Sequence, residues 1–260
     1  MKDGTILHKQ RFPSSNPRVA LWVITYACQG LKIKGMLAEP KEKGMYDGFL
    51  YLRGGIKNVG TVRPARLIQF ASQGFIVMAP FYRGNQGGEG NEDFAGDDRY
   101  DAFAAYDLLK QLPNVHHDRI HIFGFSRGGV MALLTAIEKN DSRSLVLWGG
   151  VTDMVLTYEE REDLRRMMKR VIGGTPSKYP ERYEWRTPLH RAHLVEPPVL
   201  LIHGLEDKNV SIDHSYQLES KLKKSNKKVT SWYFENFPHA FPPKENRETV
   251  KKLTKWMKAQ

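Results

Sequence analysis

The chain has 260 residues, of which 40% are hydrophobic and 27% charged, and its 40 basic and 29 acidic side chains give a formal net charge of +11. This composition is typical of a globular protein and excludes a disordered chain, and the single cysteine, Cys28, excludes an internal disulfide framework. The basic residues are spread along the chain without a recognised nucleic-acid-binding pattern, so we expect no nucleic-acid partner.

The first predicted elements form an antiparallel hairpin. Residues 19–27 precede a Gln29-Gly30 turn, and apolar and polar residues alternate over 31–38. Period-two alternation around a glycine turn is typical of two paired strands. The apolar segment 49–52 is the next strand, and it ends at Arg53-Gly54-Gly55.

Buried strands then alternate with amphipathic helices along the chain. The predicted helices cover 65–72, 97–112, 128–138, 211–224 and 243–258. The predicted strands cover 75–79, 120–125, 145–148, 199–202 and 229–234. Apolar strands separated by such helices indicate a mostly parallel sheet with helices on both faces, here with an antiparallel hairpin at the front. The sequence therefore predicts an α/β fold in a single domain, residues 1–260.

One segment, residues 151–194, breaks this alternation. It reads as a helix over 159–172 followed by a proline-rich loop. We interpret it as a lid-like insertion over one edge of the sheet. Between Val155 and Arg191 it has nine basic and six acidic residues, and this bias predicts a preference for a carboxylate-bearing substrate that replacement of Arg165 and Arg166 would test.

The strongest chemical signal is the G-x-S-x-G sequence Gly124-Phe125-Ser126-Arg127-Gly128. An apolar strand runs into it and a helix rich in Ala and Leu leaves it, which is the strand–turn–helix context of a nucleophile elbow. The glycines let the strand and the helix approach closely while the serine hydroxyl stays exposed. Ser126 is therefore the predicted nucleophile.

A serine hydroxyl needs a base to take its proton, and in enzymes with such a turn an acid and then a histidine follow along the chain. Asp207 comes directly after a buried strand and is the predicted acid, with Glu206 as the alternative. Two histidines follow Asp207. We place His214 on the surface of a helix, whereas His239 lies in a loop before the last helix and is the predicted base.

Two backbone donors are expected to bind the oxyanion that forms during acyl transfer. The N–H of Arg127, directly after the nucleophile, is one. The other is predicted in the loop after the 49–52 strand, where Gly54 and Gly55 permit close approach, and Gly55 is the preferred donor.

With these motifs the chain resembles the α/β-hydrolases and, more narrowly, the catalytic domain of the prolyl oligopeptidase family of serine peptidases. The segments that carry the resemblance are 51–55, 81–88 (Phe-Tyr-Arg-Gly-Asn-Gln-Gly-Gly), 124–129, 172–174, 185–189 and 203–210. Members commonly carry an N-terminal β-propeller, and only about thirty residues precede the similar region here, so we expect a stand-alone hydrolase domain. Arg53 stands where the family often has His or Tyr. Arg53 and Tyr82 are the candidate substrate-binding residues.

The resemblance implies an enzyme that cleaves an ester or a short peptide through an acyl-enzyme, without a metal or organic cofactor. Esterase and peptidase activity both remain open at this point, and a non-catalytic binding protein that retains the fold is the alternative. No apolar run is typical of a signal peptide or a membrane span, so we expect a cytoplasmic protein with no membrane partner. The sequence leaves a homo-oligomer open.

Overall fold

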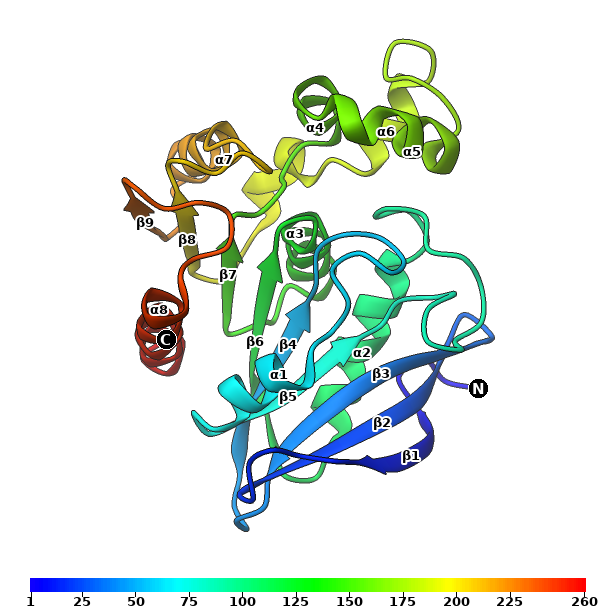
Figure 1. Cartoon of the computed structure of the whole chain (residues 1–260), viewed down its shortest axis with the longest axis vertical. Helices are drawn as coiled ribbons and strands as arrows, with labels where there is room; N and C mark the ends of the chain where they lie inside the picture. The colour runs from blue at the N-terminus through cyan, green and yellow to red at the C-terminus, as the bar shows by residue number, and fades with distance from the viewer.

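The computed structural model describes all 260 residues. A single sheet of nine strands runs through the molecule in the order β1-β2-β3-β5-β4-β6-β7-β8-β9 (Figure 1). The strands are β1 Ile6–Phe12, β2 Val19–Cys28, β3 Leu31–Pro40, β4 Tyr46–Leu52, β5 Phe75–Pro80, β6 Val115–Phe125, β7 Ser144–Trp148, β8 Val199–Gly204 and β9 Val229–Phe234. β1, β2 and β3 pair antiparallel, β3 also pairs antiparallel with β5, and all further pairs are parallel.

Helices cover both faces of this sheet, and each face has its own apolar core (Figure 1). The helices are α1 Pro64–Ala71, α2 Arg99–Gln111, α3 Gly128–Lys139, α4 Met154–Glu160, α5 Glu162–Ile172, α6 Pro180–Trp185, α7 Asp213–Lys224 and α8 Pro243–Lys258, with a 3₁₀ helix at Pro188–Leu194. α1 and α8 pack on one face, and α2, α3 and α7 pack on the other. The predicted α/β fold, with a mostly parallel sheet and an antiparallel hairpin, is confirmed.

Register in the parallel part brings the ends of four strands to one edge. Leu52 of β4 lies beside Gly124 of β6, and Gly124 lies beside Leu147 of β7. Leu147 in turn lies beside Leu201 of β8. Because parallel strands all end at the same edge, the loops that follow them are brought together there. Ser126, Asp207 and Gly54 lie in these loops, and His239 lies in the loop after β9, which pairs parallel with β8.

The structure differs from the sequence-based expectation in the polar segments. β1 was not predicted, because His8 to Arg11 are polar and exposed in an edge strand that buries little. The predicted helix 159–172 is two helices, α4 and α5, separated at Arg161, whose ψ of 79° is not helical. The proline-rich loop after it contains α6 and the 3₁₀ helix.

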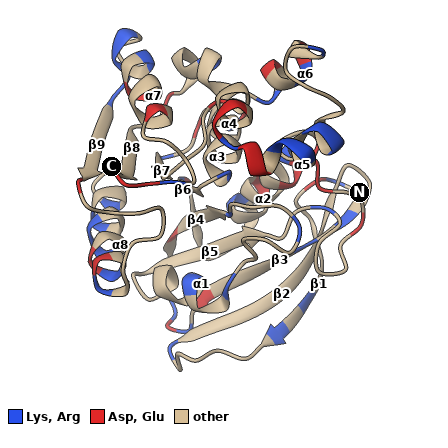
Figure 2. Cartoon of the chain, turned by 45° about the horizontal axis from the view of Figure 1, so that its top comes forward, with Lys and Arg blue, Asp and Glu red and all other residues tan.

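Charged side chains are distributed widely over the surface. Figure 2 shows Lys and Arg on several helices, including α5 and α8, and on the N-terminal strands rather than gathered on one element. None of the helices is both long enough and apolar enough to cross a membrane.

Candidate active site

Ser126 lies in the turn between β6 and α3, with a φ of +57° that few non-glycine residues adopt. The two flanking glycines are required by close packing. A Cβ atom on Gly124 would lie 2.3 Å from the carbonyl oxygen of Gly128, and one on Gly128 would lie 2.1 Å from that of Leu52. The turn therefore holds Ser126 in a strained conformation at the C-terminal edge of the sheet, as a nucleophile elbow does.

Asp207 and His239 form a close pair beside this turn. His239 Nδ1 lies 2.6 Å from Asp207 Oδ2. The other carboxylate oxygen of Asp207 accepts hydrogen bonds from the backbone N–H groups of Asn209 at 2.8 Å and Val210 at 3.0 Å. These contacts fix the carboxylate, which in turn orients the imidazole ring. Glu206, the alternative acid, is exposed.

A second histidine, which the sequence analysis did not single out, supports Asp207 from behind. His203 is fully buried at the end of β8, and its Nε2 lies 2.9 Å from the carbonyl oxygen of Val210 and 3.2 Å from Asp207 Oδ2. Two acceptors face this nitrogen, so it carries the proton. Burial alone would raise the pKa of Asp207, but the hydrogen bonds from His203 and His239 outweigh it and hold that pKa well below its usual range.

His214, the other downstream histidine, takes no part in this arrangement. The expectation that it lies on the surface of α7 is wrong, because His214 belongs to the buried stripe of that helix with Ser215, Leu218 and Leu222. Its Nδ1 faces the backbone N–H of Thr152 at 3.2 Å. Burial first, and then the nearby His203, lower its pKa from 6.5 to about 3, so the ring stays neutral.

Ser126 and His239 line the same cavity, and His239 packs against Phe125 with ring centroids 4.7 Å apart. No hydrogen bond joins the Ser126 hydroxyl to the imidazole in this structure. Catalytic hydrogen bonds are often long before substrate binds and tighten only in the Michaelis complex, so the missing bond is compatible with the predicted pair.

The predicted oxyanion donors lie beside Ser126. A Cβ atom on Gly54 would lie 2.6 Å from Ser126 Cβ and 3.1 Å from its Oγ, so the loop after β4 runs directly along the nucleophile. The backbone N–H groups of Gly54, Gly55 and Arg127 donate to no backbone acceptor. Free N–H groups beside a nucleophile suit the binding of a developing negative charge.

A buried network of ion pairs holds the two segments that carry these donors. Glu92 accepts hydrogen bonds from both Arg53 and Arg127, and also from the backbone N–H of Lys57 at 2.7 Å. Arg127 donates in addition to Asp98 at 2.9 Å. Burial would raise the pKa of Glu92, but the two guanidinium groups lower it below its usual value, so it stays ionised. One carboxylate thus connects the elbow to the loop after β4, the predicted oxyanion loop.

The structure places the two candidate substrate-binding residues differently from each other. Tyr82 is fully buried, and its ring lies between the guanidinium groups of Arg53 and Arg127, each 4.9 Å from the centroid. It does not line the cavity that contains Ser126, and its neighbours are these two arginines. Arg53 lines that cavity while pairing with Glu92.

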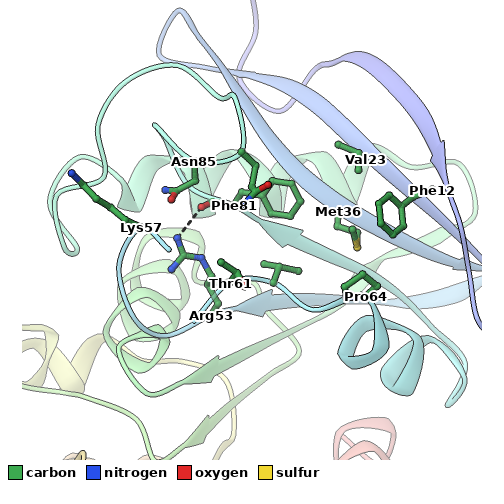
Figure 3. Close-up of a pocket in the computed structure, with 11 residues that line it drawn as sticks. Phe12, Val23, Met36, Arg53, Lys57, Thr61, Pro64, Phe81 and Asn85 are labelled. Carbon is green, nitrogen blue, oxygen red and sulfur yellow. Dashed lines mark hydrogen bonds between the residues drawn. The ribbon is translucent and has the colours of Figure 1, made fainter. Parts of the chain in front are cut away.

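Arg53 also borders a second, smaller cavity of about 250 Å³ on the other side of the loop (Figure 3). There its guanidinium donates to the carbonyl oxygen of Phe81 at 3.0 Å. Phe12, Val23 and Met36 of the N-terminal strands form the apolar wall opposite (Figure 3). The N-terminal strands therefore face the loop after β4 across this cavity.

The cavity that contains Ser126 has a volume of about 840 Å³, which is in the range of small-molecule sites. Thr157, Leu164 and Met167 of α4 and α5 form one wall. Arg66 and Asn246, from α1 and α8, lie in another part of the lining. Figure 1 shows α4 and α5 beyond the edge at which β6 and β7 end, whereas α1 and α8 lie lower, beside the sheet.

The family model that matches this chain is that of the prolyl oligopeptidase family, over residues 61–260. An uncharacterized peptidase of Bacillus subtilis strain 168, YtmA, is 67% identical over 97% of this chain and 99% of its own length. The acylaminoacyl peptidase of Pyrococcus horikoshii matches 98% of this chain and 42% of its own with a TM-score of 0.79 and 22% identity. Acetyl xylan esterase 1 of Thermoanaerobacterium sp. JW/SL YS485 matches 95% of this chain and 87% of its own with a TM-score of 0.73 and 15% identity.

The two solved structures share the fold of this chain across nearly its whole length. The family match covers most of the chain, and the bacillary relative is similar from end to end. The chain belongs to the prolyl oligopeptidase family of serine peptidases.

Proposed function

We propose that the protein cleaves short peptides or small esters by two-step acyl transfer, with Ser126, His239 and Asp207 as the catalytic triad. The observation that carries this proposal is the 2.6 Å contact between His239 Nδ1 and Asp207 Oδ2, formed in the loops beside a strained Ser126. A serine in such a turn, facing an imidazole that a buried carboxylate orients, is equipped for nucleophilic attack on a carbonyl carbon.

In the first step His239 Nε2 takes the proton of the Ser126 hydroxyl as Oγ attacks the carbonyl carbon. Asp207 keeps the Nδ1 proton in place and stabilises the imidazolium that forms. The carbonyl oxygen becomes an oxyanion, which the free N–H groups of Arg127 and Gly55, and that of Gly54 beside them, bind. His239 then gives its proton to the leaving group, and the acyl-enzyme remains.

In the second step a water molecule takes the place of the leaving group. His239 removes its proton as the oxygen attacks the acyl carbon, and the same backbone donors bind the second oxyanion. Ser126 regains its proton when the acid product leaves. We propose that α4 and α5 act as a partial lid during both steps, because Thr157, Leu164 and Met167 form a wall of the cavity.

Side-by-side assays test this function and separate its two forms. Initial rates are measured on p-nitrophenyl butyrate and on alanine p-nitroanilide, with Ser126→Ala as the matched control. We expect hydrolysis of at least one substrate class and its loss in the variant. Catalysis that survives Ser126→Ala, or a folded protein that hydrolyses neither class, would overturn the proposal, and the second result would favour the non-catalytic alternative.

A further inference from the structure

The charges that line the catalytic cavity are all of one sign. Five arginines reach its surface and no aspartate or glutamate does, and the arginines are Arg53, Arg63, Arg66, Arg127 and Arg161. Most of this charge is neutralised locally. Arg53 and Arg127 pair with Glu92, and Arg161 pairs with Asp163. Arg63 is exposed to solvent. Arg66 therefore remains as a half-buried cation that faces the cavity without an acidic partner.

Neutral groups surround Arg66. Its Nη1 group donates to the amide oxygens of Gln69 at 2.9 Å and Asn246 at 2.8 Å. Arg66 forms no salt bridge in the structure. Its Nε and Nη2 groups form no hydrogen bond of 3.5 Å or less within the protein, and the Tyr51 hydroxyl is the neighbouring acceptor that favours the charged guanidinium. Both amides line the same cavity as the guanidinium. The amide oxygen of Asn246 is already used by Arg66, so its NH₂ group is a further donor at this place.

Aromatic rings form the rest of the surroundings. The Arg66 guanidinium carbon lies 4.9 Å from the ring centroid of Phe70 and 5.4 Å from that of Trp148. Tyr51 also lines the cavity, and its hydroxyl raises the pKa of Arg66, although burial has the larger effect and lowers it. The ring contacts stabilise the guanidinium cation. Its Nε–H and Nη2–H groups point in parallel, in the geometry that matches the two oxygens of a carboxylate.

We propose that Arg66, with the Tyr51 hydroxyl and the Asn246 amide, forms a carboxylate-binding subsite inside the catalytic cavity. It rests on the proposed function and deepens it: the substrate is an acyl compound that carries a carboxylate near its scissile bond. That carboxylate belongs either to the acyl part or to the leaving group. In the preferred substrate the carboxylate binds Arg66 while the scissile carbonyl reaches Ser126.

The structure changes which arginine would account for the charge preference that the sequence suggests. Arg165 and Arg166 do not line the cavity, because they lie on other faces of α5 than Leu164 and Met167. Arg165 donates instead to Glu162 and to the carbonyl oxygens of Tyr158 and Glu159. The cation available to a substrate lies on α1, outside the insertion.

Two matched substrate pairs test the subsite. In the first pair the acyl part differs, with p-nitrophenyl butyrate as the neutral ester and mono-p-nitrophenyl glutarate as the charged one. In the second the leaving group differs, with methyl 4-butyryloxybenzoate and 4-butyryloxybenzoate. The quantity compared is the ratio of kcat/KM for the charged ester to that for its neutral partner, in the wild type, Arg66→Gln, Arg66→Lys and Arg165→Gln.

We expect a ratio of about ten or more for at least one pair in the wild type, because charge-assisted hydrogen bonds to a half-buried guanidinium are strong. Arg66→Gln should lower that ratio about tenfold and Arg66→Lys by less, since lysine keeps the charge but not the fork. Arg165→Gln should keep it. A wild-type ratio near one in both pairs, or a ratio that Arg66→Gln leaves unchanged, would overturn the proposed subsite. Arg66 would then be stabilised by the aromatic rings alone and would bind no substrate carboxylate.

A binding measurement keeps this result separate from a failure of the proposed function. Titration calorimetry follows 4-butyryloxybenzoate and mono-p-nitrophenyl glutarate binding to Ser126→Ala, with and without Arg66→Gln. Binding that needs Arg66 supports the subsite even where the wild type hydrolyses no ester. Absence of binding for both compounds, or equal binding with and without Arg66, counts against the subsite whatever the enzyme assay shows.

Discussion

On one side of Ser126, the His239 ring is held by one carboxylate that is itself fixed by His203 and by two backbone N–H groups a few residues away. On the other side, the oxyanion loop is held by Glu92 through buried charges contributed by the loop and the elbow. Removing a group from the first side should cost activity and little stability. Removing one from the second leaves a buried charge unpaired, and it should cost both.

The largest expected effect belongs to the first side. His239→Gln should lower kcat about 10⁴-fold, because no other group can take the proton of Ser126. Its free energy of unfolding should change by less than about 1 kcal/mol, since Asp207 keeps its remaining hydrogen bonds. Steady-state kinetics and urea unfolding of the same preparation measure both. A variant that loses stability along with activity would break the comparison.

On the second side, Glu92→Gln should lower the free energy of unfolding by about 3–5 kcal/mol, because Arg53 loses its carboxylate while staying buried. We expect kcat to fall as well, since the Lys57 N–H loses a charged acceptor in the oxyanion loop. Glu89→Gln, an exposed carboxylate nearby, is the matched control and should change stability by less than about 0.5 kcal/mol. Equal stability of the two variants would refute the structural role of Glu92.

The neutral His214 lies outside both sides and gives a comparison with a buried residue that has no catalytic role. Its pKa of about 3 in the folded protein lies below the 6.5 of the unfolded chain, so the unfolded state binds a proton first as the pH falls. Stability contributed by His214 is complete above about pH 6.5 and should be lost at about 1.4 kcal/mol per pH unit below it.

Urea unfolding at a series of pH values between about 7 and 5 measures this slope, with His214→Gln as the comparison. The variant cannot titrate at this position, and its amide oxygen can still accept from the Thr152 N–H. We expect a shallower loss of stability with acid in the variant. Parallel curves for the two proteins would show that His214 does not stay neutral in the fold.

The smallest expected effect concerns Gly149, at the end of β7. Its φ is +51°, and a Cβ atom there would lie 3.1 Å from both Asp207 Oδ2 and His239 Nδ1. Gly149→Ala should therefore lower kcat about tenfold by displacing the pair, and stability by about 1 kcal/mol through backbone strain. Gly30→Ala is the control, because Gly30 has a φ of +78° as well but a Cβ atom there would meet nothing within 4 Å. Loss of activity in both variants alike would show that the Asp207 contact is not the cause.

The two sides also differ in how far the sequence predicts them. Ser126, Asp207 and His239 could be placed together because each follows an apolar strand or strand-like segment, and parallel strands end at one edge. Glu92 carries no such signal, since it lies in a polar loop and its partners, Arg53 and Arg127, are distant along the chain. The predicted strand ended at residue 202 and His203 was given no role, although the four-residue spacing to Asp207 was available as a signal.

Tertiary contacts account for the remaining differences. The break at Arg161 between α4 and α5 lies inside a run of helix-forming residues, and its cause is tertiary, because Arg161 bonds to the carbonyl oxygen of Asn209 at 2.7 Å. The burial of His214 likewise depends on Thr152, a residue of the preceding insertion. Contacts of this kind bring together segments that no periodicity connects.

The claim on which the account depends is that Ser126 is an activated nucleophile. Incubation with a fluorophosphonate probe, followed by mass spectrometry of the modified peptide, tests it without knowledge of the natural substrate. The account predicts a single label on Ser126 in the wild type, which forms far more slowly in His239→Gln. A folded wild-type protein that stays unlabelled at Ser126, or a label that forms equally fast in the variant, would contradict it.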